Sequence, residues 1–141
     1  MLKIFKVHKT ARFSQCDARA LMFPHAQVEM IHETVEDWLS NALGFSYEKM
    51  HLHAEKSFPV VQVKYALIKP IKLGLEVEAG LLVSHLGRSS MTVEVELRSN
   101  EVLYSKATES MVQVDLNTLR PVALDSQLRS NAALYFKESL R

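Results

Sequence analysis

Only one stretch of this sequence has the period of a long amphipathic helix, and the apolar face of that helix must be covered by something. Apolar residues recur there at spacings of three and four, which places them on one side of a helix. Pro24 suits the first helical position because its missing N–H would be unpaired there anyway. We therefore expect a helix that opens at Phe23-Pro24 and stops at Gly44. Its apolar face consists of Val28, Ile31, Val35, Trp38, Leu39 and Ala42, and Glu29, Glu33, Glu36 and Asp37 fall mostly on the other faces.

Most of the remaining sequence alternates apolar and polar residues, as strands buried on one face do. The alternation is moderate over residues 3–13 and clear from Phe58 to Val114, with turns at Gly87-Arg88 and Asn100-Glu101. Pro70 interrupts it, which indicates a strand end or a bulge. The turns are too short to hold crossover helices, and this favours an antiparallel meander. Residues 45–57 are expected to be irregular, and residues 126–138 to form a short helix.

One strand, one long helix and then several long strands make an α+β pattern. The sheet offers the only large apolar surface for the helix, so we expect a curved antiparallel sheet wrapped around one central helix. A sheet in a chain of 141 residues still has edges that need cover. Pairing with a second copy supplies that cover, and we expect a homodimer or a homotetramer. No linker or repeat divides the chain, so a single domain is expected over residues 1–141.

The composition excludes several classes of protein. Hydrophobic residues make up 48% and charged residues 23%, and the formal net charge is +1, so nothing indicates a partner that is a nucleic acid or a membrane surface. No apolar run approaches the ~20 residues of a membrane span, and the N-terminus lacks the apolar core of a signal peptide. The single cysteine, Cys16, fits a reducing compartment and is expected to be buried. We expect a cytoplasmic protein that needs no metal or other cofactor.

A single acid stands shortly before the expected start of the helix. Asp17 ends a segment of alternating apolar residues, and Phe23-Pro24 follows a few residues later. The first turn of a helix presents unpaired backbone N–H groups and a partial positive charge. A carboxylate beside such donors is the arrangement that hydrolysis of an acyl compound needs.

In this order and at this spacing, the residues resemble the hotdog-fold acyl-CoA thioesterases, specifically the 4-hydroxybenzoyl-CoA thioesterase-like group. The resemblance covers residues 5–135 and implies the hotdog fold, a curved antiparallel sheet around one long helix. Two features depart from the family pattern: Ala18-Arg19-Ala20 contains no glycine, and the loop is one residue short. The matching segments are Gln15-Cys16-Asp17, Phe23-Pro24, Phe58-Pro59, Pro70, Gly74, Gly87-Arg88-Ser89-Ser90, Val114-Asp115 and Thr118-Leu119-Arg120-Pro121.

The resemblance implies an acyl-CoA thioesterase in which Asp17 is the catalytic carboxylate, acting as a nucleophile or as the base that activates water. Without the family match, Asp17 would be read as an ordinary capping residue. Phe23 would lend its backbone N–H to the thioester oxygen at the oxyanion site. Arg88 lies where family members contact the phosphates of coenzyme A, and a planar guanidinium suits phosphate. The implied pocket lies at the dimer interface, and the substrate-binding candidates are His25, Arg88, Ser89 and Ser90.

Other functions stay open at this point. A thioesterase acting on acyl-carrier protein would use the same scaffold, with a basic patch at the mouth of the pocket. The missing loop glycine also leaves room for a non-catalytic hotdog protein that binds acyl-CoA. A hotdog dehydratase is the weakest option, because Glu29, His32 and Glu33 would have to serve as its acids and bases. If the protein is not a dehydratase, Glu29 and His32 are expected to form a solvated pair or a pair at an interface.

Overall fold

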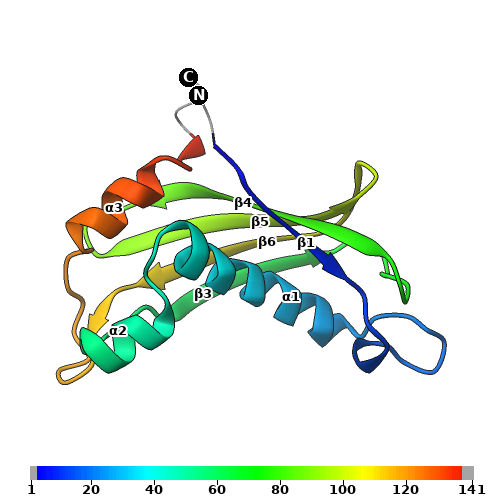
Figure 1. Ribbon diagram of the computed structural model, residues 1–141, viewed down its shortest axis with the longest axis horizontal. Helices are drawn as coiled ribbons and strands as arrows, with labels where there is room; N and C mark the ends of the chain where they lie inside the picture. Colours follow the sequence, from blue (N-terminus) through cyan, green and yellow to red (C-terminus); the bar gives the residue numbers. More distant parts are fainter. Residues whose placement is uncertain (1–2, 138–141) are drawn as a thin grey trace.

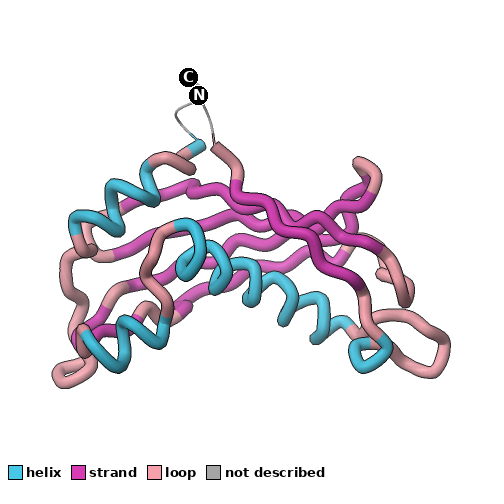
Figure 2. Tube along the Cα trace, viewed as in Figure 1, coloured by secondary structure: helices cyan, strands magenta, loops and turns pink. Residues whose placement is uncertain are grey.

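Five strands form one antiparallel sheet that curves around the long helix (Figures 1 and 2). The computed structural model describes residues 3–137. The sheet is built from β1 (Phe5–Thr10), β3 (Val60–Leu67), β4 (Glu76–Leu86), β5 (Ser90–Ser99) and β6 (Val102–Val112), and α1 (Pro24–Asp37) lies along its concave side. The smaller elements are a 3-10 turn (Phe13–Gln15), a π-helical turn (Trp38–Ala42), α2 (Tyr47–His53), the paired strands β2 (Lys56–Ser57) and β7 (Val114–Asp115), and α3 (Ser126–Ala133). The expected fold class is confirmed, and residue 138, the end of the expected last helix, lies outside the described residues.

The strand order departs from a simple meander in one place. β4, β5 and β6 are neighbours as expected, and Asn100 and Glu101 take left-handed φ angles of 47° and 67° in the tight turn before β6. β3, however, pairs with β6 and not with β4, giving the order β1-β4-β5-β6-β3. The segment from β3 to β4 therefore passes the start of α1, where the N–H of Met22 donates to the carbonyl of Ile71 at 2.7 Å. The meander prediction is wrong here because alternation indicates a strand but not its neighbour.

The apolar side of α1 packs against the sheet, slightly rotated from the expected stripe. Gln27 and Met30 are buried, whereas Val28 is only half-buried. Trp38 and Leu39 of the following π-helical turn are fully buried in the core, as expected. Among residues 3–137, no helix has the length and apolar content needed to cross a membrane.

Residues 45–57 contain a helix, so the expectation of an irregular segment is wrong. The Ser46 hydroxyl accepts a hydrogen bond from the N–H of Lys49 at 3.0 Å and caps α2. Met50 is the only residue of α2 that is buried. One apolar anchor gives no helical period, and this explains why the pattern of apolar residues missed the element.

The edge strand β3 is exposed over most of its length. Apolar side chains there are open to solvent, with 60% of Val61 and 42% of Leu67 exposed. Its outer backbone edge has no neighbouring strand among the described residues. An apolar edge of this kind is a ready template for pairing with another chain.

Candidate active site

Asp17 is held inside a tight loop by its own neighbours. Its backbone N–H donates to the Leu21 carbonyl at 2.8 Å, and its Oδ1 accepts from the N–H groups of Arg19 and Leu21 at 2.8 and 3.1 Å. These two donors hold the pKa of the Asp17 carboxyl below its ordinary value, with a smaller contribution from the Arg19 guanidinium. Ala20 adopts a φ of 62° to close the loop. The carboxylate is therefore ionised at neutral pH.

The first free N–H of α1 belongs to a different residue from the one expected. The N–H of Phe23 already donates to the Gln15 carbonyl at 2.9 Å, so it is not an unpaired donor. Pro24 has no N–H, and the later N–H groups of this turn donate back to the Phe23 carbonyl. Of the N–H groups in this first turn, only that of His25 has no acceptor among the residues that the structure describes. The side chains of Phe23 and His25 stack at the same helix end, with ring centroids 5.1 Å apart.

The turn that carries the expected phosphate contacts lies at the far end of the sheet. Arg88 is exposed, and it follows β4 at the end opposite to Glu76, the residue that pairs with Thr10 just before the Asp17 loop. The 11 residues of β4 extend over about 33 Å. One chain therefore does not bring Arg88, Ser89 and Ser90 together with Asp17. A shared site between them requires a second copy.

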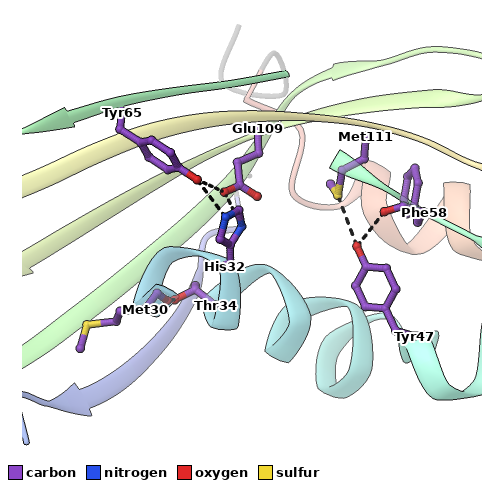
Figure 3. A network of polar contacts seen from close by, with 8 residues as sticks. All are labelled: Met30, His32, Thr34, Tyr47, Phe58, Tyr65, Glu109 and Met111. Atoms are coloured by element: carbon purple, nitrogen blue, oxygen red, sulfur yellow. Dashed lines mark hydrogen bonds and ion pairs between the residues drawn. The ribbon is translucent and has the colours of Figure 1, made fainter. Parts of the chain in front are cut away.

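A polar cluster that was not expected from the sequence joins the middle of α1 to two strands (Figure 3). The Glu109 carboxylate of β6 is fully buried and lies 2.8 Å from Nδ1 of His32. The Tyr65 hydroxyl of β3 lies 2.9 Å from Nε2 of the same ring and donates to Glu109 at 3.4 Å. Burial raises the pKa of Glu109, although the nearby His32 opposes the shift. Burial and the Glu109 charge raise the pKa of Tyr65 to about 12, which keeps its hydroxyl protonated.

The cluster borders a cavity of about 200 Å³. Oε1 of Glu109 has no hydrogen-bond partner among the described residues. The hydroxyl of Tyr47 is already used, because it donates to the Phe58 carbonyl at 2.8 Å (Figure 3). The lining residues are His32, Val35, Glu36, Tyr47, Val60 and Glu109.

The sequence did contain a signal for this cluster. Alternation along β6 places Ser105, Ala107, Glu109 and Met111 on one face, and all four are buried. An acid at a core position of a strand indicates a polar partner inside the fold. His32 is that partner, so the expected pairing of His32 with Glu29 is corrected.

Comparison with known families identifies the class of protein. The family model of the thioesterase superfamily matches residues 27–104. The curved sheet and its central helix are the hotdog fold of an enzyme that hydrolyses thioesters. The chain belongs to the thioesterase superfamily. The matched residues include His32 and Arg88 but begin after Asp17 and Phe23.

Solved structures share this fold at low sequence identity. A 1,4-dihydroxy-2-naphthoyl-CoA thioesterase from Synechocystis is 16% identical with a TM-score of 0.85, over 93% of this chain and 96% of that one. A Staphylococcus aureus protein solved in complex with CoA is 16% identical with a TM-score of 0.88, over 97% of this chain and 87% of that one. A DHNA-CoA thioesterase from Staphylococcus aureus is 19% identical with a TM-score of 0.80, over 97% and 91% of the two chains.

Proposed function

We propose that the protein hydrolyses an acyl-CoA to the free acid and coenzyme A, with Asp17 and the N-terminus of α1 as the catalytic centre. The observation that carries the proposal is an ionised carboxylate in the loop that leads directly into a helix end with a free N–H. The CoA-bound Staphylococcus aureus structure of the same fold supports a CoA ligand. Acyl-carrier protein presents the same thioester and is the second candidate for the substrate.

Each group has a separate task in the reaction. The N–H of His25 would donate to the thioester oxygen as it gains negative charge, a contact of a type worth about 10²–10³ in rate. Asp17 would attack the carbonyl carbon and expel the CoA thiolate, leaving an anhydride that water hydrolyses, or it would take a proton from the attacking water. A carboxylate with a lowered pKa is a weak base. The hydrogen bonds that lower the pKa of Asp17 weaken it as a nucleophile as well, so both routes belong to the proposal.

Phe23 and His25 would form the wall beside the reacting group. The N–H of Phe23 is committed to Gln15, so its contribution in this proposal is its aromatic ring and not its backbone donor. Both side chains are exposed, and their rings stack at the helix end. With an acyl group bound against them, they would exclude water from the oxyanion and strengthen its hydrogen bond.

A second copy would complete the site. Arg88, Ser89 and Ser90 lie too far from Asp17 in one chain, and the exposed edge of β3 offers a surface on which two copies can pair. A homodimer formed there, or a tetramer built from it, would bring the phosphate-binding turn of one chain to the catalytic loop of the other. The arrangement of copies is thus part of the proposed function.

The test is thiol release from a panel of short, medium, long and aromatic acyl-CoAs. Asp17→Asn should lower kcat/KM by about 10²-fold or more, because an amide neither attacks nor accepts the proton. Asp115→Asn is a matched control: Asp115 also accepts from two backbone N–H groups, those of Asn117 and Thr118, in a separate loop. Equal activity of Asp17→Asn and wild type would remove Asp17 from the mechanism.

Two further results would redirect the proposal. Turnover of acyl-carrier protein but not of acyl-CoA would move the substrate to the carrier. Tight binding of acyl-CoA without turnover of either thioester would indicate the non-catalytic binding protein.

A further inference from the structure

The surface around the Asp17 loop is built from two segments that are far apart in the sequence (Figure 1). Residues 11–22 lie between β1 and α1, and residues 68–75 lie between β3 and β4. The two segments run side by side, because the N–H of Leu73 donates to the Ala20 carbonyl at 2.9 Å. Side chains of both segments therefore border the candidate catalytic loop.

These two segments carry an excess of positive charge. They contain four bases and one acid, whereas the whole chain has 17 Lys and Arg residues and 16 Asp and Glu residues. The acid is Asp17, whose carboxylate is already bound by backbone N–H groups and by the Arg19 guanidinium. The other three bases, Arg12, Lys69 and Lys72, are exposed and form no ion pair with any described residue. We call these three residues the basic rim, and its charge attracts a partner of the opposite sign.

Apolar side chains lie among the bases of this surface. Phe13 follows Arg12 directly in the 3-10 turn and is 79% exposed, more than any other large apolar side chain among the described residues. Leu73 follows Lys72 and is 43% exposed. Surfaces that bind proteins combine aromatic side chains with arginine, whereas a phosphate group is bound by bases alone. The basic rim and Phe13 therefore have the composition of a docking surface for a protein, and their charge fits an acidic one.

We propose that the basic rim and Phe13 dock an acidic carrier protein that presents the acyl group as a thioester on a pantetheine arm. This inference rests on the proposed function, because the place of the surface around the Asp17 loop is what ties the partner to the substrate. Acyl-carrier protein combines an acidic surface with such a thioester. Acyl-CoA would react at the same centre, but it offers no protein surface for Phe13 to bind.

A membrane of anionic lipids has the same sign of charge as an acidic protein. It fits the site less well, because a lipid surface brings no thioester to the Asp17 loop. Docking of a carrier protein would instead place the arm beside the reacting groups. Charges at the edge of such a contact act mainly by speeding association, and salt weakens their effect.

The test compares one acyl group on three thiols: acyl-carrier protein, CoA and the uncharged N-acetylcysteamine. Wild-type enzyme at low ionic strength should show its highest kcat/KM with acyl-carrier protein, and added salt should reduce that advantage. The double variant Arg12→Glu and Lys72→Glu should lower kcat/KM about tenfold on acyl-carrier protein alone. The control is Lys106→Glu with Arg120→Glu, which changes the net charge equally. Lys106 on β6 and Arg120 beside β7 are also exposed and form no ion pair with a described residue.

The outcomes separate this inference from the proposed function. A wild-type kcat/KM that is no higher on acyl-carrier protein than on acyl-CoA would overturn the inference while leaving thioester hydrolysis intact, and this result does not depend on whether the variants fold. An equal loss on acyl-carrier protein and acyl-CoA would assign the basic rim to the phosphate of the arm. An equal loss on all three substrates would assign it a structural role. Either result would overturn docking.

If none of the three thioesters is hydrolysed, the proposed function fails, and calorimetric titration with acyl-carrier protein still tests the docking surface. Binding to wild type that becomes about tenfold weaker in the double variant would support docking. Unchanged binding would overturn it. Binding of wild type to vesicles of anionic phospholipid, without binding of acyl-carrier protein, would assign the surface to a membrane and overturn it as well.

Discussion

At the scale of single residues, the Asp17 loop combines a favourable carboxylate with an unfavourable backbone. Two N–H groups stabilise the charged form of Asp17, while Ala20 holds a left-handed φ of 62° that glycine adopts without strain. A non-glycine residue in this region costs roughly 1–2 kcal/mol. The loop therefore keeps its shape at the expense of stability.

Ala20→Gly should raise the free energy of unfolding by about 1 kcal/mol, because relief of the left-handed strain outweighs the extra entropy of glycine in the unfolded chain. Urea unfolding followed by circular dichroism measures the change. Ala18→Gly is the control, since Ala18 in the same loop has no left-handed φ and should only lose stability. Destabilisation of both variants would contradict the strain argument.

The lowered pKa of Asp17 also fixes the direction of a pH effect. A carboxyl whose folded pKa lies below its ordinary value stays charged until the pH falls through that lower pKa. The acid limb that Asp17 gives to the profile of kcat/KM should therefore lie below about pH 4, the usual range of an aspartate. Stopped assays between pH 3 and pH 7 on a stable thioester would locate it. A limb assigned to Asp17 near neutral pH would contradict the hydrogen bonds seen in the loop.

At the scale of elements, the sequence predicts what is periodic and misses what is not. The stripe of α1 and the alternation of β4, β5 and β6 gave the right elements because each buries one face. The pairing of β3 with β6 was missed, since the partner of a strand depends on where its connection runs and not on its own residues. The cap at Ser46 carries no repeating signal. The inward position of Glu109 does follow from the alternation along β6, but an acid is not a residue type that the pattern of apolar residues counts.

The same limit applies to the candidate site. Asp17 and the helix start could be placed next to each other because a short loop connects them. The use of the Phe23 N–H by Gln15 depends on how the 3-10 turn folds back, and no pattern of residue types encodes that. The separation of Arg88 from Asp17 follows from strand direction, which became visible only once the sheet order was known.

The Glu109 cluster predicts a pH dependence of stability. Burial raises the folded pKa of Glu109 above its ordinary value of 4.5, so the folded state binds this proton more tightly than the unfolded state does. Stability from this group is full below that ordinary value and is lost as the pH rises through the folded pKa. Glu109→Gln removes this titration. The free energy of unfolding of the variant, relative to that of wild type, should therefore increase as the pH rises. Denaturation curves at several pH values test this, with the exposed Glu101→Gln as control.

At the scale of the whole molecule, the exposed edge of β3 predicts how copies associate. Val61→Glu places a charge on that edge and should shift the protein toward monomer, with loss of thioester hydrolysis. Leu119→Glu is the matched control, because Leu119 is 71% exposed but lies outside the sheet. Sedimentation velocity reports the association state of each variant. Loss of association in both variants, or in neither, would remove β3 as the pairing edge.

The distance between Asp17 and Arg88 gives the last prediction. If each site takes Asp17 from one copy and Arg88 from the other, a dimer of two differently substituted chains contains one intact site. Asp17→Asn should abolish turnover, and Arg88→Ala should lower kcat/KM by about tenfold by removing a charged contact to phosphate. A hybrid dimer of the two variants has one site with both substitutions and one site with neither. Differently tagged chains, co-expressed and purified through both tags, should therefore regain wild-type kcat/KM at one site per dimer. If Asp17 and Arg88 served a site within one chain, each site of the hybrid would keep a defect and its activity would not exceed that of Arg88→Ala alone.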